Sequence, residues 1–425
     1  MNGKKTLSTI FLSLFLFSIL AVASINFGAA NPMPPLPTLP PPIYIRSNGS
    51  VDPSTAPIQQ VGDTYTFTND INNTIEVQRA NVVIDGNGFT LTKPSVNTEN
   101  LMTPIGWLPG VHVADVSNVT ITNIAFEGCI TGVTAENSSG ITINHNIIRE
   151  TLTGIVVSSA SYVSIVGNDI ALTNQSFASG IQFLPGSPQE SVPYHIKIEA
   201  NCIVGNNQEV PNIALQPEQY GIWGGFRDSE MTKNTLTNIK GIALYNIGAN
   251  NRIVGNNFQD NYEGILVNTN QELWVNNFIY GNNFDHNSEN AVVAFIRNPP
   301  VNFWYNGTVG NYWSDYTGAD GNGDGIGDSP YILKTTYTDY EQYKNVTVEE
   351  GRDNYPSMMP FDIPTITVKL PQPAPSSPTS STEPQTAEPF PTLPVAAASI
   401  IAIVAAGAGL LTYFKKRHAK LGDKV

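Results

Sequence analysis

The sequence predicts an all-β fold, a parallel β-helix built from coils of about 22 residues. Two repeating features predict this fold: an apolar column, and an asparagine two residues before most members of that column. The column comprises Phe126, Ile148, Ile170, Ile203, Leu236, Phe258 and Phe284. The asparagines are Asn146, Asn168, Asn201, Asn234, Asn256 and Asn282. A β-sandwich would have similar strand content, but it would not explain asparagines in register with an apolar column.

Each repeat is too short for a strand-helix-strand unit and lacks the apolar period of a helix. Segments 121–124, 141–143, 163–166, 196–198 and 253–255 are therefore expected to be strands that stack in parallel, with the apolar column inside. Stacked coils lie about 4.8 Å apart, so asparagine side chains can hydrogen-bond along the stack. Two longer steps in the repeat indicate loops at 184–194 and 206–220, which project between coils.

A glycine followed by Ile or Val is a second marker of the repeat. It occurs at Gly132, Gly154, Gly180, Gly221, Gly241 and Gly264. Apolar residues alternate with others after each of these glycines, as expected for a strand with one face in the core. This marker also predicts which residues lie next to one another in adjacent coils.

The composition fits a β-rich, exported protein. Only 13% of the 425 residues are charged, against about 25% in ordinary soluble domains. Small polar residues and 35 glycines supply turns instead. The net charge of -14 argues against nucleic acid as a partner, because no basic surface could neutralise phosphates.

The two ends predict export and membrane anchoring. Lys4 and Lys5 precede an apolar run that ends in small residues, as in a secretory signal peptide. An uncharged stretch of membrane-spanning length near the C-terminus is followed by four basic residues, which places the tail in the cytoplasm. The predicted organisation is a signal peptide (1–30), a proline-rich leader (31–60), the β-helix (61–300), an aromatic and Asp-rich C-terminal cap (301–362), a Pro/Ser/Thr-rich stalk (363–394), a transmembrane helix (395–414) and a basic cytoplasmic tail (415–425).

This organisation predicts a single-pass protein displayed at the cell surface. Acceptor motifs for N-glycosylation fall only on the exported side, in agreement with that topology. They stand at Asn48, Asn72, Asn118, Asn137, Asn174, Asn306 and Asn345. Several such motifs are expected by chance in so Asn-rich a chain.

Three stretches carry a resemblance to a known family: NVVIDGNGFTL (81–91), GNYWSDYTGADGNGDGIGDSPYIL (310–333) and RDNYPSM (352–358). With the asparagine-marked coils, they resemble right-handed β-helix proteins of the NosD type. The resemblance covers roughly 61–362. It implies a right-handed helix, a place among carbohydrate-binding and sugar-hydrolase repeats, and an archaeal cell-surface setting. Such repeats specify a fold more strongly than a function.

The family name is also tied to the maturation of copper sites, which favour Cys, Met and clustered His. Here the histidines of the body lie on different coils. They are His112, His145, His195 and His286. Cys129 and Cys202 are about three coils apart, too far for a disulfide or a shared ion. A copper-accessory role is therefore only a second alternative.

An aromatic cluster in YGIWGGF points to glycan binding. Ile222 is expected to face the core, which turns Trp223 outward beside Tyr220 and Phe226. An exposed indole offers a flat apolar face on which the C–H groups of a sugar can stack. Alternatively, the preceding loop folds over Trp223 and buries it.

A polysaccharide hydrolase or lyase is the first alternative function. The repeat places Asp260 on His286 and Glu263 on Glu289, and it places Lys240 beside Glu263. Two neighbouring carboxylates could serve as acid and base. The competing interpretation is a solvated turn neutralised by lysine. The Gly-His-Gly and Arg-x-Lys motifs of related polysaccharide enzymes do not occur in the body.

The stretch GADGNGDGIGDSPYIL has the spacing of a calcium loop. Its oxygen donors would be the side chains of Asp320, Asn322, Asp324 and Asp328 and the carbonyl of Ile326. The usual closing Glu is absent, and Asp315 or Asp353 are candidate substitutes. The ion is expected to be structural and to stabilise the cap; the alternative is a glycine turn with its carboxylates in water. Overall the sequence favours a surface β-helix protein that binds glycans or surface partners, or that forms part of the envelope.

Overall fold

The part of the chain described by the computed structural model covers most of the body. It comprises 40–92, 109–186, 192–206, 219–245, 248–268, 275–294, 302–339 and 344–372. The predicted signal peptide and transmembrane helix lie outside these residues. Within them, no helix is long and apolar enough to cross a membrane.

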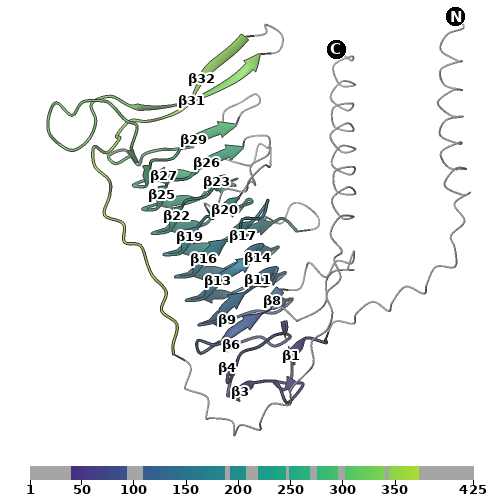
Figure 1. Ribbon diagram of the computed structural model, residues 1–425. Coiled ribbons are helices and arrows are strands. Elements are labelled where there is room, and N and C mark those ends of the chain that lie inside the picture. Colours follow the sequence, from purple (N-terminus) through teal and green to yellow (C-terminus); the bar gives the residue numbers. More distant parts are fainter. Residues whose placement is uncertain are drawn as a thin grey trace, which may run out of the picture. The chain divides into compact units, whose positions relative to one another are not determined.

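Three long sheets form the sides of a parallel β-helix, as predicted (Figure 1). Sheet A contains, in spatial order, β2 (Val51–Asp52), β1 (Ile43–Ile45), β5 (Ile75–Val77), β8 (Pro109–Ala114), β11 (Thr131–Glu136), β14 (Thr153–Ser158), β17 (Ser179–Leu184), β20 (Tyr220–Trp223), β23 (Ile242–Tyr245), β26 (Glu263–Asn268) and β29 (Glu289–Ala294). Sheet B contains β27 (Phe278–Tyr280), β24 (Arg252–Val254), β21 (Glu230–Thr232), β18 (Lys197–Glu199), β15 (Ser164–Val166), β12 (Thr142–Asn144), β9 (Val119–Thr122), β6 (Val82–Asp85), β4 (Thr64–Phe67) and β3 (Ile58–Val61). Sheet C contains β30 (Tyr312–Trp313), β28 (Asn283–Asp285), β25 (Asn257–Gln259), β22 (Thr235–Thr237), β19 (Cys202–Val204), β16 (Asp169–Leu172), β13 (Ile147–Thr151), β10 (Ala125–Glu127) and β7 (Thr90–Thr92).

The predicted apolar column is confirmed as the interior of sheet C. All seven members are fully buried, and each pairs in parallel with the next. The column extends to Leu91 at one end and to Trp313 at the other. At that second end the rings of Phe284, Trp313 and Tyr331 stack at centroid distances of 4.4 and 4.2 Å.

Backbone crowding explains the glycine marker. A Cβ on Gly154 would lie 2.4 Å from the carbonyl oxygen of Gly180 in the next coil, so any other residue would force the backbone to shift. The equivalent residue beside Gly221 is Ala243 and not Gly241, because Ile222 pairs with Leu244. The marker therefore predicts neighbours wrongly at this one coil.

A ladder of buried asparagines runs along the stack, as the repeat predicts. Each side-chain oxygen accepts hydrogen bonds from the backbone and side-chain nitrogens of the preceding asparagine, at 2.9–3.1 Å. The ladder continues from Asn282 to Asn311 and ends at Asp353. The carboxylate of Asp353 is fully buried and accepts from the Asn311 N–H at 2.6 Å and the Trp313 indole N–H at 2.9 Å.

The helix begins earlier than the sequence indicates. Residues 43–60 fall in the predicted proline-rich leader, yet β1 pairs in parallel with β5 and Ile45 is fully buried. The antiparallel pairs β1–β2 and β3–β4 then close this end. At the other end β31 (Tyr331–Asp339) and β32 (Lys344–Asp353) form an antiparallel hairpin.

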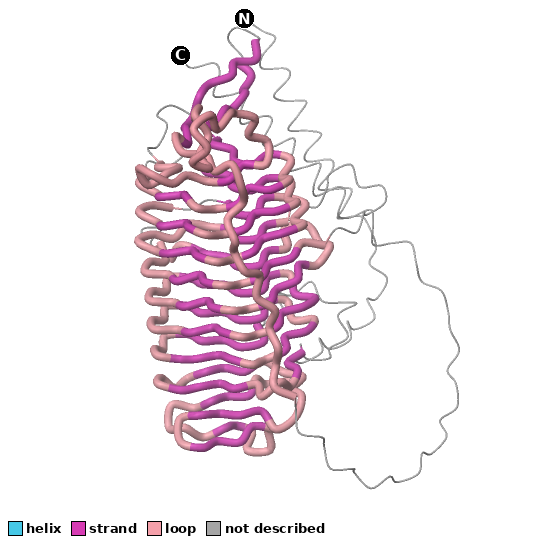
Figure 2. The backbone as a smooth tube through the Cα atoms, turned by 90° about the vertical axis from the view of Figure 1, so that its left-hand side faces the viewer, coloured by secondary structure: helices cyan, strands magenta, loops and turns pink. Residues whose placement is uncertain are grey.

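After the hairpin the chain returns along the helix as an extended segment, residues 358–372, which we call the strap. Figure 2 shows the strap running lengthwise across the coils. Asn283 exchanges two hydrogen bonds with the backbone of Phe361, at 2.9 and 2.8 Å. One coil closer to the N-terminal end, Asn257 donates to the Ile363 carbonyl at 3.2 Å. In the coil before that, the hydroxyls of Thr235 and Thr365 lie 3.2 Å apart. Part of the predicted stalk is therefore packed on sheet C.

Candidate functional site

Three aromatic side chains form a stacked group on the outer face of sheet A. Tyr220 and Trp223 lie on β20, and Tyr245 lies on β23 directly beside Trp223. The Tyr220 ring stacks on Trp223 at 5.8 Å and on Tyr245 at 5.6 Å, with interplanar angles of 29° and 28°. All three side chains are partly exposed. We call them the aromatic patch.

The aromatic patch differs from the predicted cluster in one member. Phe226 is fully buried and packs on Phe183 at 4.9 Å, so it cannot contact a ligand. The turn at Gly224, which has a φ of 104°, carries the chain from the outer face back into the core before Phe226. Tyr245 was missed because Gly241 suggested the wrong register for its coil.

The predicted acidic cluster is only partly assembled. Glu263 pairs with Glu289 in register, so these carboxylates do lie on adjacent strands. Lys240 does not lie beside Glu263, since that position is occupied by Ile242. Asp260 and His286 are exposed, both with positive φ, and a ring nitrogen of His286 lies 2.7 Å from the Asp285 carboxylate.

Asp315 and Tyr331 form a hydrogen-bonded group next to Glu289. Asp315 accepts from the Asn290 side chain at 2.7 Å and from the Tyr331 hydroxyl at 3.1 Å. Burial is the main cause that raises the pKa of Tyr331, and the negative charge of Asp315 is the second. The Tyr331 hydroxyl therefore stays protonated and donates. Asp315 and Asp353 thus have other partners in this structure.

The calcium loop is folded by its own acidic and amide side chains. Asp320 accepts from the backbone N–H groups of Gly323, Asp324 and Gly325 at 2.8–3.1 Å. Asp324 accepts from the Ile326 N–H at 2.8 Å, and Asp328 accepts from the Gly321 N–H at 2.6 Å. These are hard oxygen donors of the kind calcium prefers. No three His, Cys, Asp or Glu side chains in the described ranges are grouped closely enough to hold a metal, so an ion here would also draw on Asn322 and the Ile326 carbonyl.

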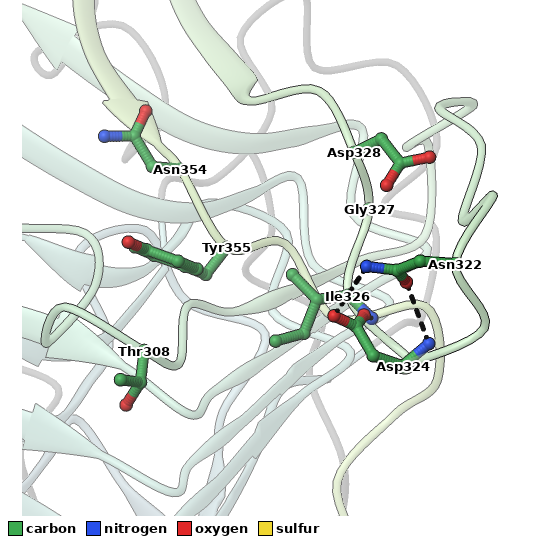
Figure 3. A pocket seen from close by; sticks show the side chains of 8 residues that line it. All are labelled: Thr308, Asn322, Asp324, Ile326, Gly327, Asp328, Asn354 and Tyr355. Atoms are coloured by element: carbon green, nitrogen blue, oxygen red, sulfur yellow. Dashed lines mark hydrogen bonds between the residues drawn. The ribbon is translucent and has the colours of Figure 1, made fainter.

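A pocket of about 330 Å³ opens between this loop and two neighbouring segments (Figure 3). We call it the cap pocket. Its lining residues are Thr308, Asn322, Asp324, Ile326, Gly327, Asp328, Asn354 and Tyr355. The predicted calcium loop supplies Asn322, Asp324, Ile326, Gly327 and Asp328. No sequence signal indicated the other wall, because Thr308, Asn354 and Tyr355 meet the loop only in the folded cap.

The residues that could bind copper are dispersed. His112 is hydrogen-bonded to Glu76 at 2.8 Å, and neither Cys129 nor Cys202 forms a disulfide bond. Burial raises the pKa of Cys202, which disfavours the thiolate that a metal requires.

The predicted glycosylation sites lie at the surface wherever the structure describes their exposure. The six exposed sites are Asn48, Asn72, Asn118, Asn137, Asn174 and Asn306. The exposure of Asn345 lies outside the description.

Two protein-family models match the chain. Residues 58–225 match "Right handed beta helix region", and residues 194–318 match "Periplasmic copper-binding protein (NosD)". No curated protein matches the sequence significantly.

Solved structures share the fold at low similarity. A variant of the periplasmic alginate epimerase AlgG is 14% identical with a TM-score of 0.30, over 56% of this chain and 51% of that one. The alginate lyase from Paenibacillus sp. str. FPU-7 is 12% identical with a TM-score of 0.30, over 56% and 97%. The surface adhesin PfbA of Streptococcus pneumoniae is 9% identical with a TM-score of 0.25, over 52% and 82%. The chain thus spans about half of the epimerase, and similarities this low carry no argument about activity or ligand.

Proposed function

Because the chain is a right-handed parallel β-helix protein of the NosD type, we propose that it is a membrane-anchored cell-surface protein that binds glycans. The observation that carries this proposal is the aromatic patch. Partly exposed, stacked rings on a rigid sheet give a sugar chain an apolar surface at little cost in conformational entropy.

The sheet supports the aromatic patch along the direction of stacking. Gln182 lies beside Trp223 in the preceding coil, and Leu266 lies beside Tyr245 in the following one. A surface that continues from coil to coil suits an extended ligand, because successive sugar units can contact successive strands. The amide of Gln182 adds a hydrogen-bonding group next to the indole.

Calcium at the loop would serve this function indirectly. The ion would be bound by Asp320, Asn322, Asp324, Asp328 and the Ile326 carbonyl, and it would stabilise the cap that covers the open end of the stack. The aromatic patch contains none of these donors. Glycan binding there is therefore expected to persist when calcium is removed.

Neither alternative function has comparable support in the described residues. Lys240 is out of register with Glu263, and Asp260 and His286 occupy equivalent positions on exposed turns of adjacent coils. Because the His and Cys residues are dispersed, the only support for copper handling is the description of the matching family. Glycan binding is the function that the surface chemistry favours.

The test is a glycan array probed with the full chain, followed by titration of the hits. Replacing Trp223 or Tyr245 by Ala should weaken binding by about 1–3 kcal/mol, or about 5- to 150-fold. Tyr162→Ala is the control, because Tyr162 is an exposed tyrosine just before β15 of sheet B, where it packs on Tyr194 and His195 and not on the aromatic patch. Unchanged affinity in both patch variants would rule this site out, and release of reducing sugars from the hits would favour the hydrolase instead.

A further inference from the structure

The cap pocket has the dimensions of a site for one small ligand. Its volume of about 330 Å³ is near the lower end of the range for ligand pockets, roughly 300–1,000 Å³. Thr308, Asn354 and Tyr355 lie on one side, and Asn322 and Asp324 lie across from them (Figure 3). A long polymer could place only one of its units, or its end, in the cap pocket.

The walls of the cap pocket combine apolar and polar groups. The Tyr355 ring and Ile326 provide an apolar surface. Around it are two amides, two carboxylates and one hydroxyl, from Asn322, Asn354, Asp324, Asp328 and Thr308. A sugar ring has the complementary chemistry, because its C–H face can pack on an aromatic ring while its hydroxyls donate and accept at the rim.

Charge narrows the ligand class further. No lysine or arginine lines the cap pocket, and two carboxylates do. While no calcium is bound to the loop, an anionic sugar or a phosphate would be repelled by Asp324 and Asp328, whereas neutral hydroxyls can donate to their carboxylate oxygens. We infer that the cap pocket binds one neutral saccharide unit, as a site separate from the aromatic patch and independent of the patch's role.

The lining side chains are held in place before any ligand arrives. The Tyr355 N–H donates to Asp353 at 3.0 Å, and its carbonyl accepts from the Gly310 N–H at 3.0 Å. The Tyr355 ring packs against Tyr305 at 5.3 Å, and the Tyr305 hydroxyl accepts from the Asn354 side chain at 2.9 Å. Such preorganisation lowers the entropy cost of binding.

To test this inference, methyl α-glucoside, methyl α-mannoside and glucuronate are each titrated into the full chain in detergent. Binding is measured by ligand-observed NMR. The chain is made without N-linked sugars, since Thr308 belongs to the acceptor motif of Asn306 and an attached glycan could compete. With chelator present, at least one neutral glycoside should bind, and glucuronate should bind at least tenfold more weakly. Each titration is run with chelator and again with calcium.

Variants locate the site. Asn354→Ala should weaken binding about three- to tenfold through the loss of one hydrogen bond, and Tyr355→Ala should abolish it. Gln259→Ala, an exposed amide elsewhere, and Trp223→Ala should leave it unchanged. Asn354 is exposed, so its variant keeps the proposal testable if Tyr355→Ala fails to fold. The inference is overturned if neither glycoside binds, if only calcium binds, if glucuronate binds as tightly, or if both pocket variants bind normally.

Discussion

Replacing Asn234 by alanine should destabilise the β-helix strongly, as should the same change at its equivalents in the asparagine ladder. The Asn234 side-chain oxygen accepts from the backbone and side chain of Asn201, both at 2.9 Å. Its amide nitrogen donates to the Ile198 carbonyl at 2.8 Å, to the Thr232 carbonyl at 3.0 Å and to the Asn256 side chain at 2.9 Å. All five hydrogen bonds disappear in the variant.

The expected cost follows from what is left behind. The buried N–H of Asn201 loses its acceptor, which costs about 1–3 kcal/mol. Loss of the bonds to the two carbonyls adds roughly 0.5–1.5 kcal/mol each. The total of about 2–6 kcal/mol is a large part of the 5–15 kcal/mol by which folded domains are typically stable.

Urea unfolding followed by circular dichroism measures this loss. Gln259→Ala is the control, because it removes an exposed amide on the neighbouring strand β25 and should change stability by less than about 0.5 kcal/mol. If Asn234→Ala were as stable as that control, the ladder would not contribute the stability assigned to it here.

Two further outcomes are expected. Calcium at a hundred times its dissociation constant should stabilise the chain by about 2.7 kcal/mol. Thermal melting with calcium and with chelator should show this shift in the wild type but not in Asp324→Ala. Four identical melting curves would mean that the loop is only a turn. Hydrogen bonding to Glu76 raises the pKa of His112 above its ordinary 6.5 despite partial burial. The stability from this pair is fully present below pH 6.5 and is lost as the pH rises through the raised pKa. Urea midpoints between pH 6 and 9 should therefore fall in the wild type relative to Glu76→Gln, and parallel profiles would contradict the assignment.

The interior could be predicted from the sequence because its signal repeats. A residue such as Ile203 has the same environment as its counterpart in every other coil, so the column and the asparagines identify one another. Irregular coils lack this redundancy. Gly241 matches the marker in sequence but lies two residues before the equivalent position, and this shift misplaced Lys240 and hid Tyr245.

The ends of the helix and the cap pocket could not be predicted in this way. Pairing of β1 with β5 depends on contacts between segments about 30 residues apart that share no repeat. Phe226 was misplaced because it was grouped with Trp223 by closeness in sequence, although alternation from the buried Ile222 would place it in the core, where it lies. Asn354 and Asp324 meet in the cap pocket only through the folding of the hairpin and the loop.

The strap determines where a mechanical load enters the β-helix. Tension on the chain beyond residue 372 pulls first on the strap and only afterwards on the cap. The load meets the buried side chain of Val368, then the contact at Thr235, then that at Asn257, and then the paired bonds at Asn283. Because these contacts are few and lie on successive coils, they can break one after another while the asparagine ladder stays intact. The strap would thus act as a sacrificial element that lengthens under force before the coils unfold.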